Sequence, residues 1–160
     1  MGDKFKFDVV IGNPPYQEEQ EGDNKNYAPP IYHKFLSEAY KVANIVEMIH
    51  PARFLFNAGA TPAEWNNKML ANEHLKVMYY EQNSSKVFSN TDIKGGIVVT
   101  YYDKVNTFES IKIFTPFVEL NSILKKVLNR SNHFNSFDTI ISGRTIYHFN
   151  PLIHKEHPDI

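Results

Sequence analysis

Two consecutive prolines follow a short apolar stretch near the start of this 160-residue chain. The stretch reads FDVVIG (7–12), and Pro14 and Pro15 come directly after Asn13. Proline fixes φ and has no N–H to donate, so this pair ends any strand or helix that reaches it. An amide side chain, rigid carbonyls and the ring of Tyr16 are therefore held at the carboxyl end of a strand. Open α/β sheets bind ligands at that end of their strands, and the sequence predicts a site here.

Strand-like and helix-like segments alternate along much of the chain. The expected strands are 5–11, 45–50, 75–82 and 95–103, and the expected helices are 29–43, 61–73 and 117–128. The first strand is rich in Val and Ile with little alternation, which predicts a buried, parallel-type strand. Helices separate the first three strands, which should be parallel, whereas a helix-free linker before the fourth predicts an antiparallel strand. The predicted fold class is α/β, a mostly parallel sheet with one antiparallel strand and helices on its faces.

Two local predictions concern the ends of these elements. Thr61 is expected to be the N-cap of the 61–73 helix, with Pro62 in its first turn. Ile111–Phe114 is expected to be a further short strand, before the amphipathic segment at 117–128.

Composition limits the classes of partner and site. The chain has 17 basic and 18 acidic residues, whereas a self-sufficient nucleic-acid binder generally carries a basic excess. It has no cysteine, which excludes disulfides and Cys-ligated zinc and fits a cytoplasmic protein. No apolar run approaches the roughly 20 residues of a membrane helix, so no membrane partner is expected. His154 and His157 lack an evident third ligand, and no metal site is expected.

The segment Asn13 to Tyr16 suits the chemistry of an exocyclic amine. The amide oxygen of Asn13 and the carbonyl oxygen of Pro14 can together accept both hydrogens of an amine such as adenine N6. These bonds take the nitrogen lone pair out of conjugation and make the nitrogen nucleophilic. Tyr16 offers a face for base stacking, worth about 1–3 kcal/mol. Two other interpretations stay open: a Pro-rich turn that only ends a strand, and a peptide ligand for phosphotyrosine-binding domains.

The stretch FDVVIGNPPYQ (7–17) resembles the catalytic motif of the N6-adenine DNA methyltransferases of restriction–modification systems. The segment KVFSNTDIKGGIVVTYYDK (86–104) is similar to a later motif of that family, and MIHPARFLFNAG (48–59) to the strand and loop between them. SFDTIISGRTIYH (136–148) is similar to the entry to the family's target-recognition domain. The resemblance thus extends over most of the chain.

This resemblance implies roles for individual residues. Asn13, Pro14, Pro15 and Tyr16 would be catalytic, and Phe88 would pack on the other side of an extruded adenine. Phe88 can also be read as a small hydrophobic anchor for its loop. Arg53 and Lys94 are candidate DNA contacts, although exposed cations are often only solvated.

The resemblance also implies a cofactor, partners and a domain organisation. The methyl donor would be S-adenosylmethionine, and the partners double-stranded DNA with a flipped adenine and a restriction endonuclease domain or subunit. The family's Gly-rich loop and acidic cofactor residue have no match before Asp8. We therefore expect a fragment, inactive alone, with the C-terminal half of a Rossmann-like methyltransferase sheet. Residues 1–104 would form the target-base half of the catalytic domain, and 105–160 a connecting helix and the start of a target-recognition domain.

Other functions remain compatible with the sequence. The same Asn-Pro-Pro-Tyr pocket can present a protein glutamine amide or an RNA guanine amine to a methyl donor. The long turn at 86–96 and the segment like a recognition domain argue against glutamine. A non-catalytic binding module is the alternative from a different class.

Overall fold

The computed structural model describes residues 6–18, 28–130 and 140–141, which fall into two units. The first unit is Met1–Pro116, and the second, Phe117–Ile160, contains helix α3 (Val118–Arg130), which matches the helix predicted at 117–128. The segment 136–148, apart from Ile140 and Ile141, and the pair His154 and His157 lie outside the described residues. Within the described residues no helix combines the length and apolar character needed to cross a bilayer.

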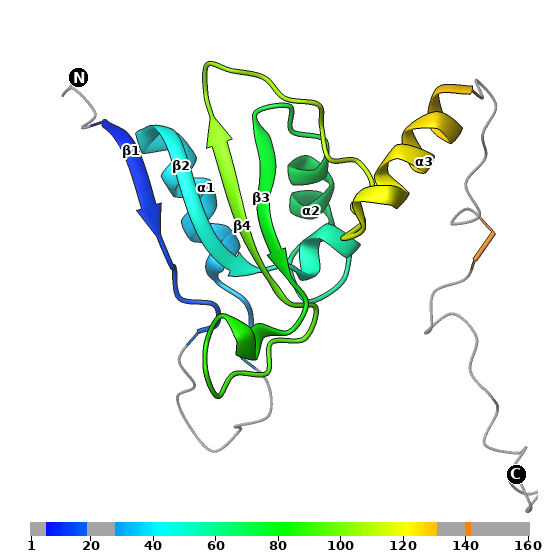
Figure 1. The fold of residues 1–160 in the computed structure, drawn as a ribbon. Coiled ribbons are helices and arrows are strands. Elements are labelled where there is room, and N and C mark those ends of the chain that lie inside the picture. Colours follow the sequence, from blue (N-terminus) through cyan, green and yellow to red (C-terminus); the bar gives the residue numbers. More distant parts are fainter. Residues whose placement is uncertain (1–5, 19–27, 131–139, 142–160) are drawn as a thin grey trace, which may run out of the picture. The chain divides into compact units, whose positions relative to one another are not determined.

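The first unit is built on a four-stranded mixed sheet. Its strands are β1 (Phe7–Gly12), β2 (Ala43–Pro51), β3 (Leu75–Glu81) and β4 (Ile97–Asp103), in the order β1-β2-β4-β3 (Figure 1). β1 is parallel to β2, and β4 is antiparallel to both β2 and β3. Three strands therefore run in one direction, as predicted, and the fourth is inserted between β2 and β3. An α/β fold with one reversed strand is confirmed, but the sheet is mixed and not mostly parallel as predicted, because the reversed strand lies between β2 and β3 and leaves β1–β2 as the parallel pair.

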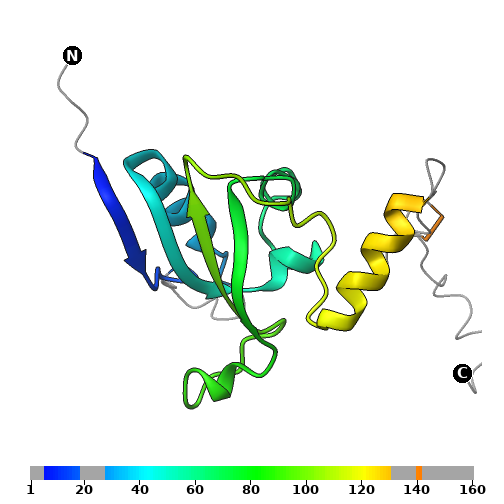
Figure 2. The same cartoon turned by 45° about the horizontal axis from the view of Figure 1, so that its top comes forward.

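Two helices cover one face of this sheet. α1 (Tyr32–Val42) precedes β2 and α2 (Ala63–Leu70) precedes β3, and both lie on the same side of the strands (Figures 1 and 2). α1 buries Tyr32, Leu36 and Ala39, whose spacing places them on one stripe of a helix. The stripe joins Val46 and other residues of the sheet in a single hydrophobic cluster. This cluster fixes the elements that carry the site described below.

The opposite face of the sheet is open along β1. Phe7, Val9 and Ile11 share that face and are exposed, Ile11 to 76%. Val10 points the other way and packs against the core. The prediction of a buried strand at 5–11 is therefore wrong for its described part, because β1 is the edge of the sheet and both helices lie on one face.

Two local predictions are also wrong. Pro62, not Thr61, is the N-cap of α2, and α2 has no side-chain cap. The Thr61 hydroxyl instead donates to Asn66 Oδ1 at 2.7 Å. No strand forms at Ile111–Phe114. Lys112 has a φ of 52°, which interrupts an extended backbone, and its N–H donates to the Leu70 carbonyl at 2.8 Å.

Candidate functional site

The Asn-Pro-Pro segment follows the last residue of β1 without a gap. Asn13 is exposed, and its side chain makes no hydrogen bond to the part of the chain that the structure describes. Pro14 is buried and Pro15 is exposed. The prolines end the strand at the predicted place, and the amide of Asn13 lies at its carboxyl end.

Residues 16–18 are hydrogen-bonded to the segment just before α1. The N–H of Ile31 donates to the carbonyl of Tyr16 at 3.1 Å, and the N–H of Glu18 donates to the carbonyl of Pro29 at 3.0 Å. Gln17 and Pro30 form an antiparallel bridge between these two bonds. Tyr16 is therefore positioned by backbone bonds as well as by its side chain.

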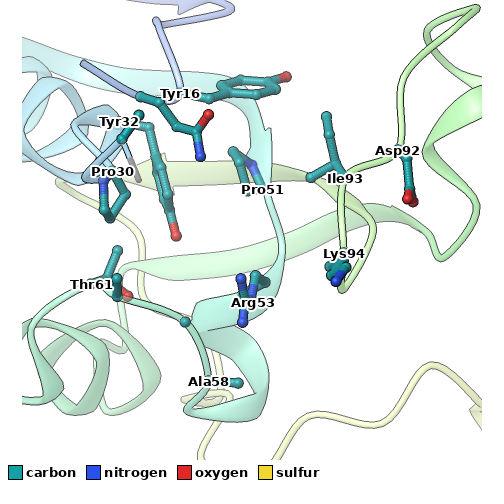
Figure 3. A pocket seen from close by; sticks show the side chains of 14 residues that line it. Tyr16, Pro30, Tyr32, Pro51, Arg53, Ala58, Thr61, Asp92, Ile93 and Lys94 are labelled. Carbon is teal, nitrogen blue, oxygen red and sulfur yellow. The ribbon is translucent and has the colours of Figure 1, made fainter. Parts of the chain in front are cut away.

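A cavity of about 380 Å³ lies beside this bridge, at the carboxyl ends of β1 and β2 (Figure 3). It is lined by residues 16–17, 28, 30, 32, 51, 53, 58–61 and 92–94. Small-molecule sites are usually between about 300 and 1,000 Å³, so the cavity is large enough for a ligand of that class.

Tyr16 contributes an aromatic ring at one end of the cavity (Figure 3). The residue is half-buried and packs against the hydrophobic core. Its hydroxyl is buried, and this desolvation raises the pKa of the phenol to about 12. The ring is therefore uncharged at neutral pH and suited to stacking on a flat ligand.

Tyr32 lines the cavity from the first turn of α1 and is 3% exposed. Its ring stacks on that of His50, with centroids 5.3 Å apart and planes 17° apart. Burial raises the pKa of Tyr32 to about 12, against the opposing influence of Thr61 and Arg53. Tyr32 is thus a neutral side chain held in one orientation by the residues around it.

His50 lies behind Tyr32 and is fully buried. Its Nδ1 is 3.1 Å from the Pro51 carbonyl and its Nε2 is 2.9 Å from the Thr100 hydroxyl. Because a carbonyl oxygen only accepts, Nδ1 carries the proton and Nε2 accepts from Thr100. Burial lowers the pKa of His50 to about 4, so the ring is neutral. These bonds fix Pro51 and the ring that supports Tyr32.

A loop between β3 and β4 supplies the facing side of the cavity through Asp92, Ile93 and Lys94. The buried Ser84 organises this loop: its hydroxyl donates to the Thr91 carbonyl at 3.0 Å and accepts from the Ile93 N–H at 2.9 Å. The Gly96 N–H donates to the Ile93 carbonyl at 3.0 Å. The loop therefore has a defined conformation set by one side chain and its own backbone.

The cavity gathers charges of both signs. Arg53 begins the short 3-10 helix η1 (Arg53–Phe56), directly after β2, and Lys94 comes from the loop opposite. Asp92 is the one carboxylate among the lining residues. The lining therefore carries two cations and one anion beside its aromatic end.

The predicted site residues divide into two groups. Tyr16, Arg53 and Lys94 line the same cavity, although they are far apart in the sequence. Asn13, Pro14, Pro15 and Phe88 are not among its lining residues. Phe88 is half-buried in the loop that Ser84 organises, and its N–H donates to the Ser84 carbonyl at 2.9 Å.

Several lining residues were not identified from the sequence, among them Tyr32, Pro51, Thr61 and Ile93. Tyr32 carried a usable signal, because it is an aromatic residue in the first turn of the helix that follows the polar loop. Pro51 ends the second strand, and the carboxyl ends of parallel strands are where open α/β sheets bind ligands. Ile93 had no distinguishing pattern.

Comparison of the sequence with known proteins gives a family match and a related protein. Residues 1–88 match the family model of the Eco57I restriction-modification methylase. An uncharacterized adenine-specific methylase of Mycoplasma pneumoniae is 34% identical over 95 residues, which cover 58% of this chain and 22% of the relative. The matched part is thus less than a quarter of that protein. No solved structure matches the chain.

The family match includes β1, the Asn-Pro-Pro-Tyr segment, α1, β2 and the Arg53 segment, and it ends at Phe88. It therefore covers most of the elements that build the cavity and more than half of the chain. The chain belongs to the Eco57I restriction-modification methylase family.

Proposed function

We propose that this chain is part of a DNA methyltransferase that transfers a methyl group to N6 of adenine in a restriction–modification system. The observation that carries the proposal is the place of Tyr16: the aromatic residue of the Asn-Pro-Pro-Tyr motif lines a cavity at the carboxyl end of β1. Family membership and the adenine-specific relative support the same reaction class.

In this proposal Asn13 and Pro14 handle the acceptor amine. The amide oxygen of Asn13 and the carbonyl oxygen of Pro14 accept its two hydrogens, and the freed lone pair becomes the nucleophile. Pro15 keeps this acceptor pair rigid because its φ is fixed. Tyr16 and Phe88 stack on the two faces of the base after it leaves the duplex, which offsets part of the few kcal/mol of unstacking.

The methyl donor of the full-length protein is proposed to be S-adenosylmethionine, which supplies an electrophilic methyl group when bound. The described residues contain no Gly-rich loop of the G-x-G-x-x-G type after a strand, so they do not form its binding site by themselves. We assign to this chain the acceptor side of the reaction and expect it to be inactive alone.

The proposed fold is the C-terminal half of a Rossmann-like methyltransferase sheet. Three strands that run in one direction, with a reversed strand between β2 and β3, support it, and β1 lies at the edge of the sheet that the described residues form. Residues 1–104 would be the target-base half of the catalytic domain and 105–160 the connection to a target-recognition domain. The cellular compartment proposed is the cytoplasm.

The proposed substrate is double-stranded DNA with a flipped adenine, and a restriction endonuclease domain or subunit acts on the same sites. Arg53 and Lys94 are proposed as DNA contacts. Both lie in the cavity with Tyr16, which supports a contact close to the flipped nucleotide.

The test is methyl transfer from tritiated S-adenosylmethionine to adenine-containing duplex DNA by the full-length protein. We expect N6-methyladenine in the digested product, its loss in Asn13→Ala, and a large decrease in Tyr16→Ala. Asn67→Ala is the matched control, because Asn67 is exposed on α2 and does not line the cavity.

Other outcomes would replace the proposal. Label in protein glutamine or RNA guanine would assign the same residues to another acceptor amine. Cofactor binding without any transfer would favour a non-catalytic binding module.

A further inference from the structure

Arg53 is an exposed cation of the cavity, and its side-chain stem packs against two glycines. A Cβ on Gly59 would lie 3.3 Å from Arg53 Cβ and Nε, and a Cβ on Gly95 would lie 2.6 Å from Arg53 Cγ. Both glycines have positive φ, 97° and 89°, which other residues rarely adopt. Two loops that are distant in the sequence therefore pack their bare backbone against the stem of one arginine.

The backbone around Arg53 is tied to both loops. The Ala58 N–H donates to the Arg53 carbonyl at 3.1 Å, and the Ala52 N–H donates to the Gly96 carbonyl at 2.9 Å. The Tyr80 hydroxyl donates to the Gly95 carbonyl at 3.3 Å. The stem of Arg53 is thus confined before any ligand arrives, which lowers the entropic cost of using its guanidinium group.

The charge around Arg53 is not neutralised within the cavity. Neither Arg53 nor Lys94 forms an ion pair with a carboxylate of the described residues. Asp92 likewise forms no ion pair with a lysine, arginine or histidine of the described residues. Among the described lining residues, Arg53, Lys94 and Asp92 sum to one positive charge, with Tyr16 and Tyr32 neutral. Figure 3 shows Tyr16 at one end of the view and Arg53 and Lys94 toward the other. The cavity therefore combines an aromatic ring with two cations that form no ion pair with the described residues.

We propose that Arg53, confined between Gly59 and Gly95, and Lys94 bind the phosphate of the nucleotide whose base stacks on Tyr16. This inference rests on the proposed function and names the ligand of that cavity as a whole nucleotide. A guanidinium binds phosphate through paired N–H bonds, and the lysine adds a point charge. Gly95 and Gly59 are positioning residues, because a Cβ at Gly95 would force the Arg53 stem to move and one at Gly59 would crowd it.

The test is a titration of the isotope-labelled chain, followed by NMR, with adenosine 5′-monophosphate, adenosine and inorganic phosphate. We expect the monophosphate to bind about tenfold more tightly than adenosine, with shifts at Tyr16 and Arg53. Arg53→Gln and Lys94→Gln should each remove most of that preference while adenosine binding stays unchanged. Lys68→Gln is the charge control, because Lys68 is exposed on α2 and does not line the cavity.

Gly95→Ala separates position from charge. It keeps both cations but places a methyl group where the Arg53 stem lies, so it should also remove the preference for the phosphate. Thermal unfolding of each variant identifies any loss of fold. If Arg53→Gln does not fold, the effect of Lys94→Gln on the preference for the monophosphate tests the phosphate site.

The failures of the two proposals are distinguishable. Equal binding of adenosine and its monophosphate, both lost in Tyr16→Ala, would overturn the phosphate site and leave the base pocket intact. A preference for the monophosphate that remains in both Arg53→Gln and Lys94→Gln would also overturn the proposed phosphate site. Absence of adenosine binding at millimolar concentration would count against both the base pocket and the nucleotide site.

Discussion

The cavity has two sides of different construction. The packed wall (Tyr32, Pro51 and Thr61) is almost completely buried and rests on α1, α2 and β2. The loop wall (residues 58–60 and 92–94) is mostly exposed and is held by hydrogen bonds and by glycines with positive φ. The packed wall supplies aromatic and apolar surface, whereas the loop wall supplies Asp92 and Lys94.

This difference separates what keeps the site in shape from what gives it specificity. Substitutions behind the packed wall should act mainly on the free energy of unfolding, because they remove buried contacts. Substitutions in the loop wall should act mainly on ligand binding, because few buried contacts are lost there. The predictions below test this division, starting with the largest expected effect.

Phe54→Ala should give the largest loss of stability. Phe54 is 0% exposed, and its ring lies 5.5 Å from that of His50 and 5.4 Å from that of Trp65. Truncation of a buried phenylalanine typically costs about 3–5 kcal/mol. Urea unfolding measures the change, and Phe56→Ala on the same short helix is the control, since Phe56 is 42% exposed. Equal losses for the two variants would contradict a buried support behind Tyr32.

The packed wall should also make stability depend on pH through His50. Burial lowers the pKa of folded His50 to about 4 from 6.5, so on acidification the unfolded chain takes up a proton before the folded one. The free energy of unfolding should therefore fall as pH decreases from about 6.5 to about 4, by about 3 kcal/mol in total for this residue. Above pH 7 the ring of His50 is neutral in both the folded and the unfolded chain, and its contribution to the free energy of unfolding no longer changes with pH.

Urea unfolding at several pH values, compared between the chain and His50→Leu, measures this effect. The variant is less stable at neutral pH, because Thr100 and the Pro51 carbonyl lose a partner, but its pH dependence should be weaker. His33, whose pKa is also lowered by burial and by Lys34, contributes in the same direction in both proteins. Identical pH profiles would show that His50 is not the titrating group.

Local pattern was sufficient to predict much of the fold. Within the described residues, the apolar runs and helical spacing predicted the strands β1 to β4, the helices α1, α2 and α3 and the reversed direction of β4. Whether β1 was buried could not be predicted this way, because burial depends on which face of the sheet the helices cover. Thr61 has the right chemistry for an N-cap, but a tertiary hydrogen bond to Asn66 engages its hydroxyl.

The site was only partly predictable for a related reason. Tyr16, Arg53 and Lys94 stood out because each lies beside prolines, glycines or a strand end in the sequence. Tyr32 and Ile93 reach the cavity through the packing of α1 and the conformation of the Ser84 loop. The contact between Arg53 and Gly95 joins residues far apart in the sequence, and no local pattern encodes it.

Gly96→Ala should lower stability by about 2 kcal/mol or more. Its φ of 81° alone costs a non-glycine residue about 1–2 kcal/mol. A Cβ there would also lie close to the backbone carbonyl of Glu81 at the end of β3, which cannot move without disturbing the β3–β4 pair. Gly95→Ala is the matched control, because its Cβ meets the Arg53 side chain and not backbone at the closest approach.

We expect Gly95→Ala to cost less stability, about 1–2 kcal/mol from its φ alone, and to affect binding more than Gly96→Ala does. Unfolding by urea gives the first comparison and the nucleotide titration the second. The reverse order of stabilities would place the structural role at Gly95 and would weaken its assignment as a positioning residue.

Lys94→Gln should have the smallest effect on stability, less than about 0.5 kcal/mol. Lys94 is exposed and forms no ion pair with the described residues, so its replacement breaks no ion pair of the fold that they form. Its effect should appear in the salt dependence of nucleotide binding, because one phosphate contact is lost. Titration with adenosine 5′-monophosphate at low and high salt measures this, and the variant should show the weaker dependence. A large loss of stability with unchanged binding would mean that the loop wall is structural, and the division between the two walls would not hold.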